Sequence, residues 1–344
     1  MPYPVYFRRV RLRLGALALV GLAVACGGSE QLSPSTDGVV ATGDSLAAPV
    51  ASTAVPTDSA VVTIDSTSAS TLALAGGSGI VFGTFDLDLA LLGSLHTGSL
   101  RLPTPYTLPL NLATARSKGA RLVLRLSGSE SNIKNSDGTF SFTKWKGMVD
   151  RFKTVNFSAY ITDGTVLGHY LIDEPYSTAR WGGKTISQAT VEQMAKYSKQ
   201  LWPGMTTFAR AAPSWLAGST TVYTYLDAGW AQYASYQGNV TTWITAEAAK
   251  AKLKGLGLIV GANVLNGGNG SSGIRGTQSG KWSMSATELR NYGTALLSQT
   301  LACGWFNWSY LYTGSTYFGR ADIKSAMTDL SNKAKAHVRT SCRQ

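Results

Sequence analysis

The feature that most constrains the fold is an alternation of short apolar segments with amphipathic segments, which begins near residue 77. The apolar segments have the length of β-strands and lie at 80–86, 121–127, 166–173, 205–211, 222–228, 256–264 and 304–310. The segments with helical periodicity lie at 111–119, 142–155, 190–202, 241–255, 285–299 and 320–338. Several of these helices end in glycine just before the next strand, as helix-to-strand loops prefer. Near-continuous apolar strands that alternate with helices predict a parallel sheet covered on both faces.

The length of residues 77–344 fits a (β/α)8 TIM-type barrel, which belongs to the α/β class. The segment 96–102 is the candidate for the eighth strand, and without it the barrel would have one irregular or missing βα unit. A doubly wound open sheet is the alternative, but no glycine-rich phosphate loop follows the first strand. The pattern therefore favours the barrel.

Residues 1–25 differ from the rest of the chain. A basic stretch with four arginines precedes the apolar run ALALVGLAVA, which is too short to span a bilayer as a permanent helix, and Cys26 follows closely. This order resembles a bacterial lipoprotein signal peptide, which implies a lipid on Cys26 and an extracytoplasmic protein anchored to a membrane of the cell envelope or surface. An ordinary secretory signal is the alternative, and it also predicts a location outside the cytoplasm.

Residues 26–76 are rich in Ser, Thr, Ala, Gly, Asp and Pro and have no sustained period, which is typical of a flexible tether. If Cys26 carries the lipid, Cys303 and Cys342 remain as a pair. An oxidising compartment permits a disulfide between them, which would tie the C-terminal tail to a late strand. Two free thiols are the alternative.

The composition excludes several function classes. The net charge is +12, and the four signal arginines account for four of these charges, so the mature chain carries 12 − 4 = +8. The basic residues are scattered, without a basic patch among aromatics, so we expect no nucleic-acid partner. A merely solvated basic surface and attraction to an acidic glycan or anionic envelope both stay open. The three histidines lack metal-ligand spacing, and we expect a monomer without metal or cofactor.

Polar residues gather at the predicted C-terminal ends of the strands, where barrels of this kind place their active sites. These residues are Asp86, Asp88, Arg125, Ser127, Glu130, Asp173, Glu174, Arg210, Asp227, Trp230, Asn263, Asn266, Asn307, Trp308 and Tyr310. The opposite ends carry mostly Gly and Thr. A single residue of the set could form a structural ion pair. The concentration of so many polar residues at one end of the barrel predicts a functional site at that end, which we call the rim.

The stretch GHYLIDEPYS ends an apolar strand in two adjacent carboxylates, Asp173 and Glu174, before Pro175. Neighbouring residues on a strand point to opposite faces, so only one carboxylate would face the barrel mouth unless a bulge turns both upward. Glu174 is longer and is the last residue before the turn, so we assign the chemical role to it. Asp173 is expected to orient Arg125, Arg210 or His169.

The pattern of two apolar residues followed by Asp-Glu-Pro resembles the Asn-Glu-Pro signature of many retaining glycoside hydrolases, in which the glutamate is the general acid/base. The resemblance implies a glycoside-hydrolase-like barrel over 77–344, with Glu174 as general acid/base. The chain departs from the family at Asp173 and at the late strand 256–264, which offers Asn263 but no acid. Glycoside hydrolysis usually needs two carboxylates. We take Asp227 as the second one, and the next candidates are Asp86, Asp88 and Glu130.

Aromatic residues in or near the rim loops favour a sugar ligand, because their faces match the C–H faces of a pyranose. They are Tyr176, Trp181, Trp215, Trp230, Tyr233, Trp282, Trp305, Trp308 and Tyr310, most of which are expected to be packing residues. The glycine-rich loop 266–282 is interpreted as a mobile lid or as surface filler.

The expected substrate contacts are Asp86, Arg125, Asp173, Tyr176, Arg210, Trp230, Asn263 and Trp308. Together the patterns predict a membrane-tethered, extracytoplasmic glycoside hydrolase that acts on a poly- or oligosaccharide. The alternatives are a non-catalytic glycan-binding lipoprotein on the same barrel and a structural envelope protein without a ligand.

Overall fold

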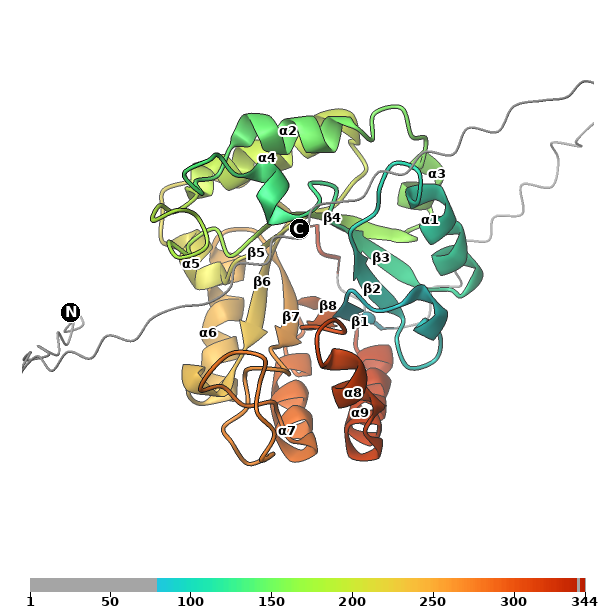
Figure 1. Cartoon of the computed structure of the whole chain (residues 1–344), viewed down its shortest axis with the longest axis vertical. Coiled ribbons are helices and arrows are strands. Elements are labelled where there is room, and N and C mark those ends of the chain that lie inside the picture. Colours follow the sequence, from blue (N-terminus) through green and yellow to red (C-terminus); the bar gives the residue numbers. More distant parts are fainter. Residues whose placement is uncertain (1–78, 339–340, 344) are drawn as a thin grey trace, which may run out of the picture. The chain divides into compact units, whose positions relative to one another are not determined.

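A computed structural model describes residues 79–338 and 341–343 of the chain. Eight parallel strands close into a barrel in sequence order, and helices surround it (Figure 1). The strands are β1 (Val81–Phe85), β2 (Gly98–Arg101), β3 (Arg121–Leu124), β4 (Val166–Asp173), β5 (Thr207–Arg210), β6 (Ala228–Tyr233), β7 (Gly257–Ala262) and β8 (Ala302–Asn307). The predicted (β/α)8 barrel is confirmed, and β2 lies inside the segment proposed for the eighth strand.

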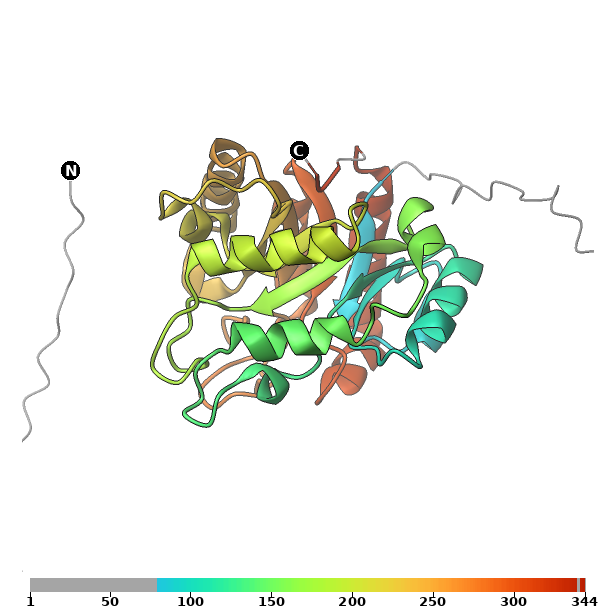
Figure 2. The same ribbon diagram turned by 90° about the horizontal axis from the view of Figure 1, so that it is seen from above.

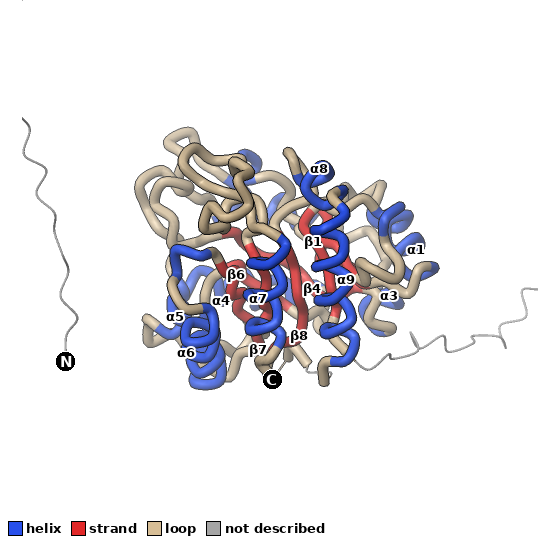
Figure 3. Tube along the Cα trace, turned by 90° about the horizontal axis from the view of Figure 1, so that it is seen from below, coloured by secondary structure: helices blue, strands red, loops and turns tan. Residues whose placement is uncertain are grey.

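The helices form a layer outside the strands, as two further views show (Figures 2 and 3). They are α1 (Leu108–Ser117), α2 (Phe142–Asp150), α3 (Ser158–Thr162), α4 (Gln188–Leu201), α5 (Pro213–Ala217), α6 (Val240–Leu253), α7 (Ala286–Leu297), α8 (Gly314–Gly319) and α9 (Ala321–Ala336), with 3-10 turns η1 (Leu89–Leu91), η2 (Glu130–Ile133) and η3 (Ser235–Gln237). Ser187, Asn239 and Ser285 begin α4, α6 and α7, where each side chain accepts a hydrogen bond from a backbone N–H three residues later. Within residues 79–338 and 341–343, none of the helices has the length and apolar character needed to cross a membrane.

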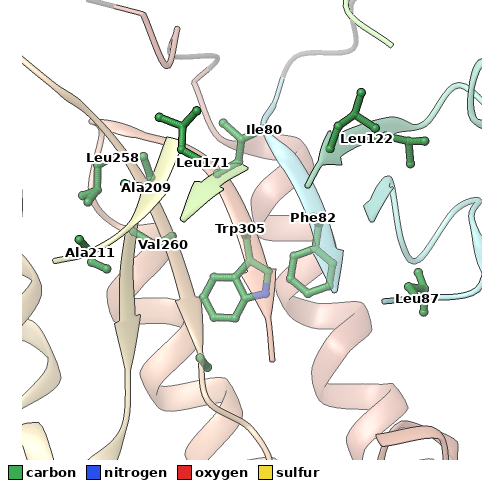
Figure 4. Packing of buried hydrophobic residues seen from close by; sticks show 14 of the residues in the cluster. Ile80, Phe82, Leu87, Leu122, Leu171, Ala209, Ala211, Leu258, Val260 and Trp305 are labelled. Atoms are coloured by element: carbon green, nitrogen blue, oxygen red, sulfur yellow. The ribbon is translucent and has the colours of Figure 1, made fainter. Parts of the chain in front are cut away.

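The strands bury side chains on both of their faces, which explains their near-continuous apolar sequences. One cluster of apolar side chains fills the space between barrel and helices; Figure 4 shows Phe82 of β1 and Trp305 of β8 side by side in this layer, with ring centroids 5.7 Å apart. A second cluster fills the barrel interior and includes Phe85, Tyr170, Phe208, Trp230 and Phe306. The barrel is thus a packed core, and a ligand can enter only at its ends.

The predicted strand at 222–228 is wrong, because the sixth strand runs over Ala228–Tyr233. Residues 222–226 form a loop in which Val222 is 79% exposed. The carboxylate of Glu192 on α4 accepts hydrogen bonds from the backbone N–H groups of Thr224, Tyr225 and Leu226, at 2.8–3.0 Å. These bonds replace the ladder bonds that a strand would supply.

The predicted disulfide between Cys303 and Cys342 is confirmed, with 5.2 Å between the two Cα atoms. It joins the C-terminal tail to the start of β8, and both cysteines belong to the cluster inside the barrel. Arg343 fastens the tail further, because its guanidinium donates to the backbone oxygens of Pro203 and Met205. The tail therefore covers the amino end of the barrel and leaves the carboxyl end as the face for a site.

Candidate active site

The end of β4 presents two adjacent carboxylates to the barrel mouth. The pairing of β4 with β5 shifts register between Tyr170 and Ile172, and Glu174 has a φ angle of 41°. A positive φ is uncommon for a residue with a side chain and changes the direction of the chain at this point. Asp173 and Glu174 consequently contact the same two arginines, so the irregular arrangement left open by the sequence is the one observed.

Asp173 lies deep in this cluster and is 8% exposed. Its carboxylate accepts hydrogen bonds from Arg210 Nε, from Arg180 Nη1 at 3.0 Å and from the Tyr170 hydroxyl at 2.8 Å. Burial alone would raise the pKa of Asp173, but the two arginines outweigh burial and lower it to about 2. Asp173 is therefore ionised at neutral pH, and of the three expected neighbours it holds Arg210.

Glu174 is more open, with its side chain 27% exposed. Its Oε1 lies 2.8 Å from Arg210 Nη2, and its Oε2 lies 2.8 Å from Arg180 Nη2. Burial opposes the charge of Arg210, yet Asp173 and Glu174 raise its pKa well above the ordinary value. The two arginines thus hold both oxygens of a carboxylate that faces the mouth.

Arg180 is a central residue that the sequence analysis missed. It lies in the loop after β4, and its Nη1 also contacts Oε1 of Glu130 in η2. The Oε2 atom of Glu130 lies 3.6 Å from Lys134 Nζ. The loop is shaped by Trp181, whose Nε1 donates to the backbone oxygen of Glu174 at 3.0 Å. The available signal was an arginine shortly after Asp-Glu-Pro, but a loop residue, unlike a strand end, has no position fixed by the barrel pattern.

Asp86 follows β1 at the same end of the barrel and has a φ angle of 56°. Its backbone N–H donates to the oxygen of Leu100, and within the described ranges no hydrogen bond or ion pair reaches its carboxyl group. Burial raises the pKa of Asp86, and Arg101 and Arg125 offset part of this increase. The Asp86 carboxyl group therefore differs from that of Glu174, which forms direct ion pairs with two arginines.

A cavity lies between the ends of β4, β5, β6 and β7. Its lining consists of Glu174, Tyr176, Arg210, Ala212, Trp230, Gln232, Tyr236, Gln237, Trp243 and Asn263. Tyr176 is 41% exposed and Tyr236 is 72% exposed, so their rings are open to a ligand. Gln232, Tyr236, Gln237 and Trp243 were missed because the sixth strand was placed too early in the sequence.

Asp227, expected as the second catalytic carboxylate, is the main error in the predicted site. It precedes β6 and lies at the amino end of the barrel, where it accepts hydrogen bonds from Lys199 Nζ at 2.6 Å and from the Thr207 backbone N–H at 2.8 Å. The strand that was expected to end near Asp227 in fact begins at Ala228. Asp227 is a structural ion-pair residue on the far side of the barrel from Glu174.

The other expected contacts divide into two groups. Tyr176, Arg210, Asn263 and Trp230 line the cavity with Glu174, although Trp230 is only 1% exposed. Trp308 lies outside that lining, with its ring centroid 5.8 Å from that of Tyr312. Arg125, which follows β3, and Asp86, which follows β1, are not among the residues that line the cavity.

Several conspicuous residues have structural roles. Trp181 and Trp305 are fully buried, and Asn307 faces Met327 of α9. His169 is also buried, its Nδ1 is 2.8 Å from Ser198 Oγ, and burial lowers its pKa to about 3.

The loop 266–282 is braced by its own hydrogen bonds, since the Asn266 side-chain oxygen accepts from Thr277 and from the Gln278 backbone N–H. The part of the chain that the structure describes has no group of three or more His, Cys, Asp or Glu arranged to hold a metal ion.

Comparison with known proteins gives the fold but no family. No family model and no curated protein matches the chain. Among solved structures, xylanase 10B from Thermotoga petrophila RKU-1 in complex with xylobiose has a TM-score of 0.50 at 9% identity, over 76% of this chain and 97% of that one. A GH2 beta-galacturonidase from Eisenbergiella tayi also has a TM-score of 0.50, at 12% identity, over 74% of this chain and 51% of that one.

A beta-glucuronidase from an uncultured Clostridium sp. aligns with a TM-score of 0.49 at 13% identity, over 74% of this chain. The chain spans about half the length of this protein and of the galacturonidase. At these identities the likeness concerns the fold, a TIM barrel like that of solved glycoside hydrolases.

Proposed function

We propose that the chain is a glycoside hydrolase that cleaves a poly- or oligosaccharide, with Glu174 and Asp86 as its two catalytic carboxyl groups. One observation supports this most: two carboxyl groups that differ in their direct partners lie at the carboxyl end of one barrel. Glu174 is held by two arginines, whereas no partner within the described ranges reaches the carboxyl group of Asp86. Glycoside hydrolysis needs such a pair, one ionised and one protonated.

Glu174 has the setting of the ionised member of the pair. An ionised carboxylate only accepts hydrogen bonds, and each oxygen of Glu174 faces a guanidinium group. We therefore assign Glu174 as the nucleophile, or as the base that activates water. This differs from the general acid/base role that the Asp-Glu-Pro resemblance implied, because the resemblance did not include Arg180.

Asp86 has the setting of the protonated member. Burial raises its pKa, which favours the form that can donate a proton. In the proposed reaction, Asp86 gives its proton to the glycosidic oxygen as the bond from that oxygen to the anomeric carbon breaks. Glu174 attacks the anomeric carbon directly or removes a proton from the attacking water. Tyr176 and Tyr236 beside the cavity would stack against the sugar ring.

The test compares glycosides with good and poor leaving groups. We expect Glu174→Gln to lower turnover of both substrates by roughly 10²–10⁴-fold. Asp86→Asn should lower turnover only of the substrate whose leaving group needs a proton. Asp88→Asn is the matched control, because Asp88 is an exposed neighbour that caps η1 through the Ala90 N–H. Unchanged turnover of the poor-leaving-group substrate in both catalytic variants would refute the mechanism.

A non-catalytic glycan-binding protein is the second candidate, and one observation favours it. Arg180 and Arg210 engage both oxygens of Glu174, so a substrate must displace one contact before Glu174 can react. Wild-type protein that binds oligosaccharides of a broad panel but cleaves none of them would support this candidate over the enzyme.

We further propose that the protein acts outside the cytoplasm as a monomer, tethered to a membrane by a lipid on Cys26. Cys26 and the tether 26–76 lie outside the described residues, so this part rests on the sequence. The Cys303–Cys342 disulfide supports an oxidising compartment.

A further inference from the structure

Three consecutive strand ends bring two arginines next to Asp86. The backbone N–H of Asp86, after β1, donates to the oxygen of Leu100 on β2 at 3.0 Å. The backbone N–H of Arg125, after β3, donates to the oxygen of Arg101, the last residue of β2, at 2.8 Å. Both guanidinium groups act electrostatically on the Asp86 carboxyl group, so the three side chains share one region of the rim.

These two arginines have few partners for their charge. The nearest acid to Arg125 is Glu130, at 3.7 Å from its Nη2, which is too long for a hydrogen bond. Arg101 donates one hydrogen bond, from Nη1 to the backbone oxygen of Leu87 at 3.0 Å. Within residues 79–338 and 341–343, Arg101 forms no ion pair, and the Nε atoms of both arginines are buried without a hydrogen-bond partner.

In the rest of the ion-pair network at the rim, the numbers of positive and negative side chains are equal. Arg180 contacts three carboxylates, Arg210 contacts two of these, and Lys134 contacts Glu130. Counted over the whole cluster, five cationic side chains (Arg101, Arg125, Lys134, Arg180 and Arg210) face four carboxyl groups (Asp86, Glu130, Asp173 and Glu174). The excess positive charge therefore lies at Arg101 and Arg125.

We propose that Arg101 and Arg125 bind an acidic substituent of the glycan, a carboxylate or a sulfate ester, beside Asp86. This inference rests on the proposed function and narrows the substrate to an acidic glycan. Guanidinium groups recognise planar or multi-oxygen anions through charge-assisted hydrogen bonds, which are stronger than bonds to neutral hydroxyls. A neutral sugar would leave the excess charge at this part of the rim uncompensated.

Contacts within the protein restrict the side chains of Arg101 and Arg125 before any anion binds. The side chain of Arg125 is 13% exposed, and its guanidinium lies 5.9 Å from the centroid of the Tyr170 ring. The hydrogen bond to Leu87 fixes Arg101. Because less side-chain freedom is lost on binding, fixed arginines gain affinity for a fitting anion.

The bound anion would also act on the proposed proton donor. Arg101 and Arg125 lower the pKa of Asp86 and so oppose the effect of burial. An anion that neutralises the arginines removes this opposition, and the pKa of Asp86 rises. The acidic substituent would thus help Asp86 to keep its proton until the glycosidic bond breaks.

The test is calorimetric titration of the full chain with three tetrasaccharides of similar length: galacturonate, galactose 6-sulfate and neutral galactose. We expect one acidic series to bind more tightly than the neutral one. Arg125→Gln and Arg101→Gln should each weaken acidic binding by roughly 10–100-fold, the effect of one charge-assisted contact, with little change for the neutral sugar. Comparison of the galacturonate and sulfate arms identifies the anion.

The control is Arg290→Gln, which removes the same charge from α7, where Arg290 pairs with Asp329. Arg125→Lys keeps the charge but loses the forked geometry, and it should show an intermediate affinity. If Arg290→Gln lost as much affinity for the acidic tetrasaccharides as Arg125→Gln, general charge attraction would explain the binding, and the proposal would be overturned. Equal binding of acidic and neutral sugars, or no binding of either acidic series, would also overturn it.

The same measurements separate this inference from the proposed function. If acidic tetrasaccharides bind through Arg125 but are never cleaved, the subsite stands and the hydrolase proposal fails. If neutral glycans are cleaved and acidic ones do not bind, the hydrolase proposal stands and the subsite fails. The circular dichroism melt of each variant, compared with wild type, shows whether it is folded before affinities are compared.

Discussion

Asp173→Asn tests whether the buried ion-pair network at the end of β4 stabilises the fold. The Asp173 carboxylate is 8% exposed and accepts from Arg210, Arg180 and Tyr170. Its pKa falls from the ordinary 3.8 to about 2. At 1.36 kcal/mol per pKa unit, this shift corresponds to about 2 kcal/mol of folding free energy at neutral pH.

The substitution removes one partner of a buried pair, which typically costs about 3–5 kcal/mol. Arg210 keeps a second partner, since Glu174 lies 2.8 Å from its Nη2. We therefore expect the free energy of unfolding to fall by about 2–3 kcal/mol at pH 7. For a domain of this size, that corresponds to a drop in melting temperature of roughly 5–10 °C.

The pH dependence gives a second, independent check. A carboxyl group with a lowered pKa in the folded state stabilises the fold fully above its ordinary pKa. The stabilisation is lost as the pH falls through the folded-state value. For Asp173 the window runs from about pH 4 down to about pH 2. The difference between wild type and Asp173→Asn should be constant from pH 7 to pH 5 and should shrink below pH 4.

The assay is urea denaturation of both proteins at pH 7, 5, 4 and 3, followed by fluorescence and circular dichroism. The matched control is Asp329→Asn, whose exposed carboxylate pairs with Arg290 on the surface and should change stability by less than about 1 kcal/mol. A change of less than about 0.5 kcal/mol for Asp173→Asn at pH 7 would refute the reasoning. A difference that stays constant down to pH 3 would show that Asp173 is not the titrating group.

Three further outcomes are expected. Replacing both cysteines of the Cys303–Cys342 disulfide, which are 39 residues apart, should lower stability by about 3–4 kcal/mol in thermal melts, and an unchanged melt would contradict this. Gly261→Ala should lower the free energy of unfolding by about 3 kcal/mol, because the added Cβ would overlap the backbone of β8. Gly304→Ala is the control, because its added Cβ would lie 3.6 Å from the nearest atom. Equal melting temperatures of the two variants would contradict this prediction. Cys26→Ser should move the protein from the membrane fraction to the soluble fraction, and continued membrane association would count against the lipid anchor.

The fold was predictable because the alternation of strands and helices is a property of the chain itself. Strands buried on both faces need near-continuous apolar sequence, and only a few arrangements satisfy eight of them. The one strand that was misplaced shows the limit of this reasoning. Residues 222–226 have the apolar character of a strand, but Glu192, distant in sequence, holds their backbone N–H groups. A tertiary contact thus overrides local pattern.

The candidate site was predictable only in part, for the same reason. The sequence identified Glu174, Asp173 and Arg210, because strand ends of a barrel meet at one rim. It placed Asp227 at that rim through the misplaced strand, although Asp227 lies at the amino end. It missed Arg180, because a residue in a loop has no position fixed by the period of a strand.

The role proposed for Glu174 shows why a motif alone does not define a mechanism. The resemblance of the Asp-Glu-Pro stretch to the Asn-Glu-Pro signature implied that Glu174 is the general acid/base. The irregular end of β4 instead turns Asp173 and Glu174 toward Arg210, and the following loop returns Arg180 to the same place. A carboxylate between two guanidinium groups is suited to attack or to remove a proton. In the proposed mechanism the proton comes from Asp86, whose carboxyl group has no hydrogen-bond or ion-pair partner among the described residues.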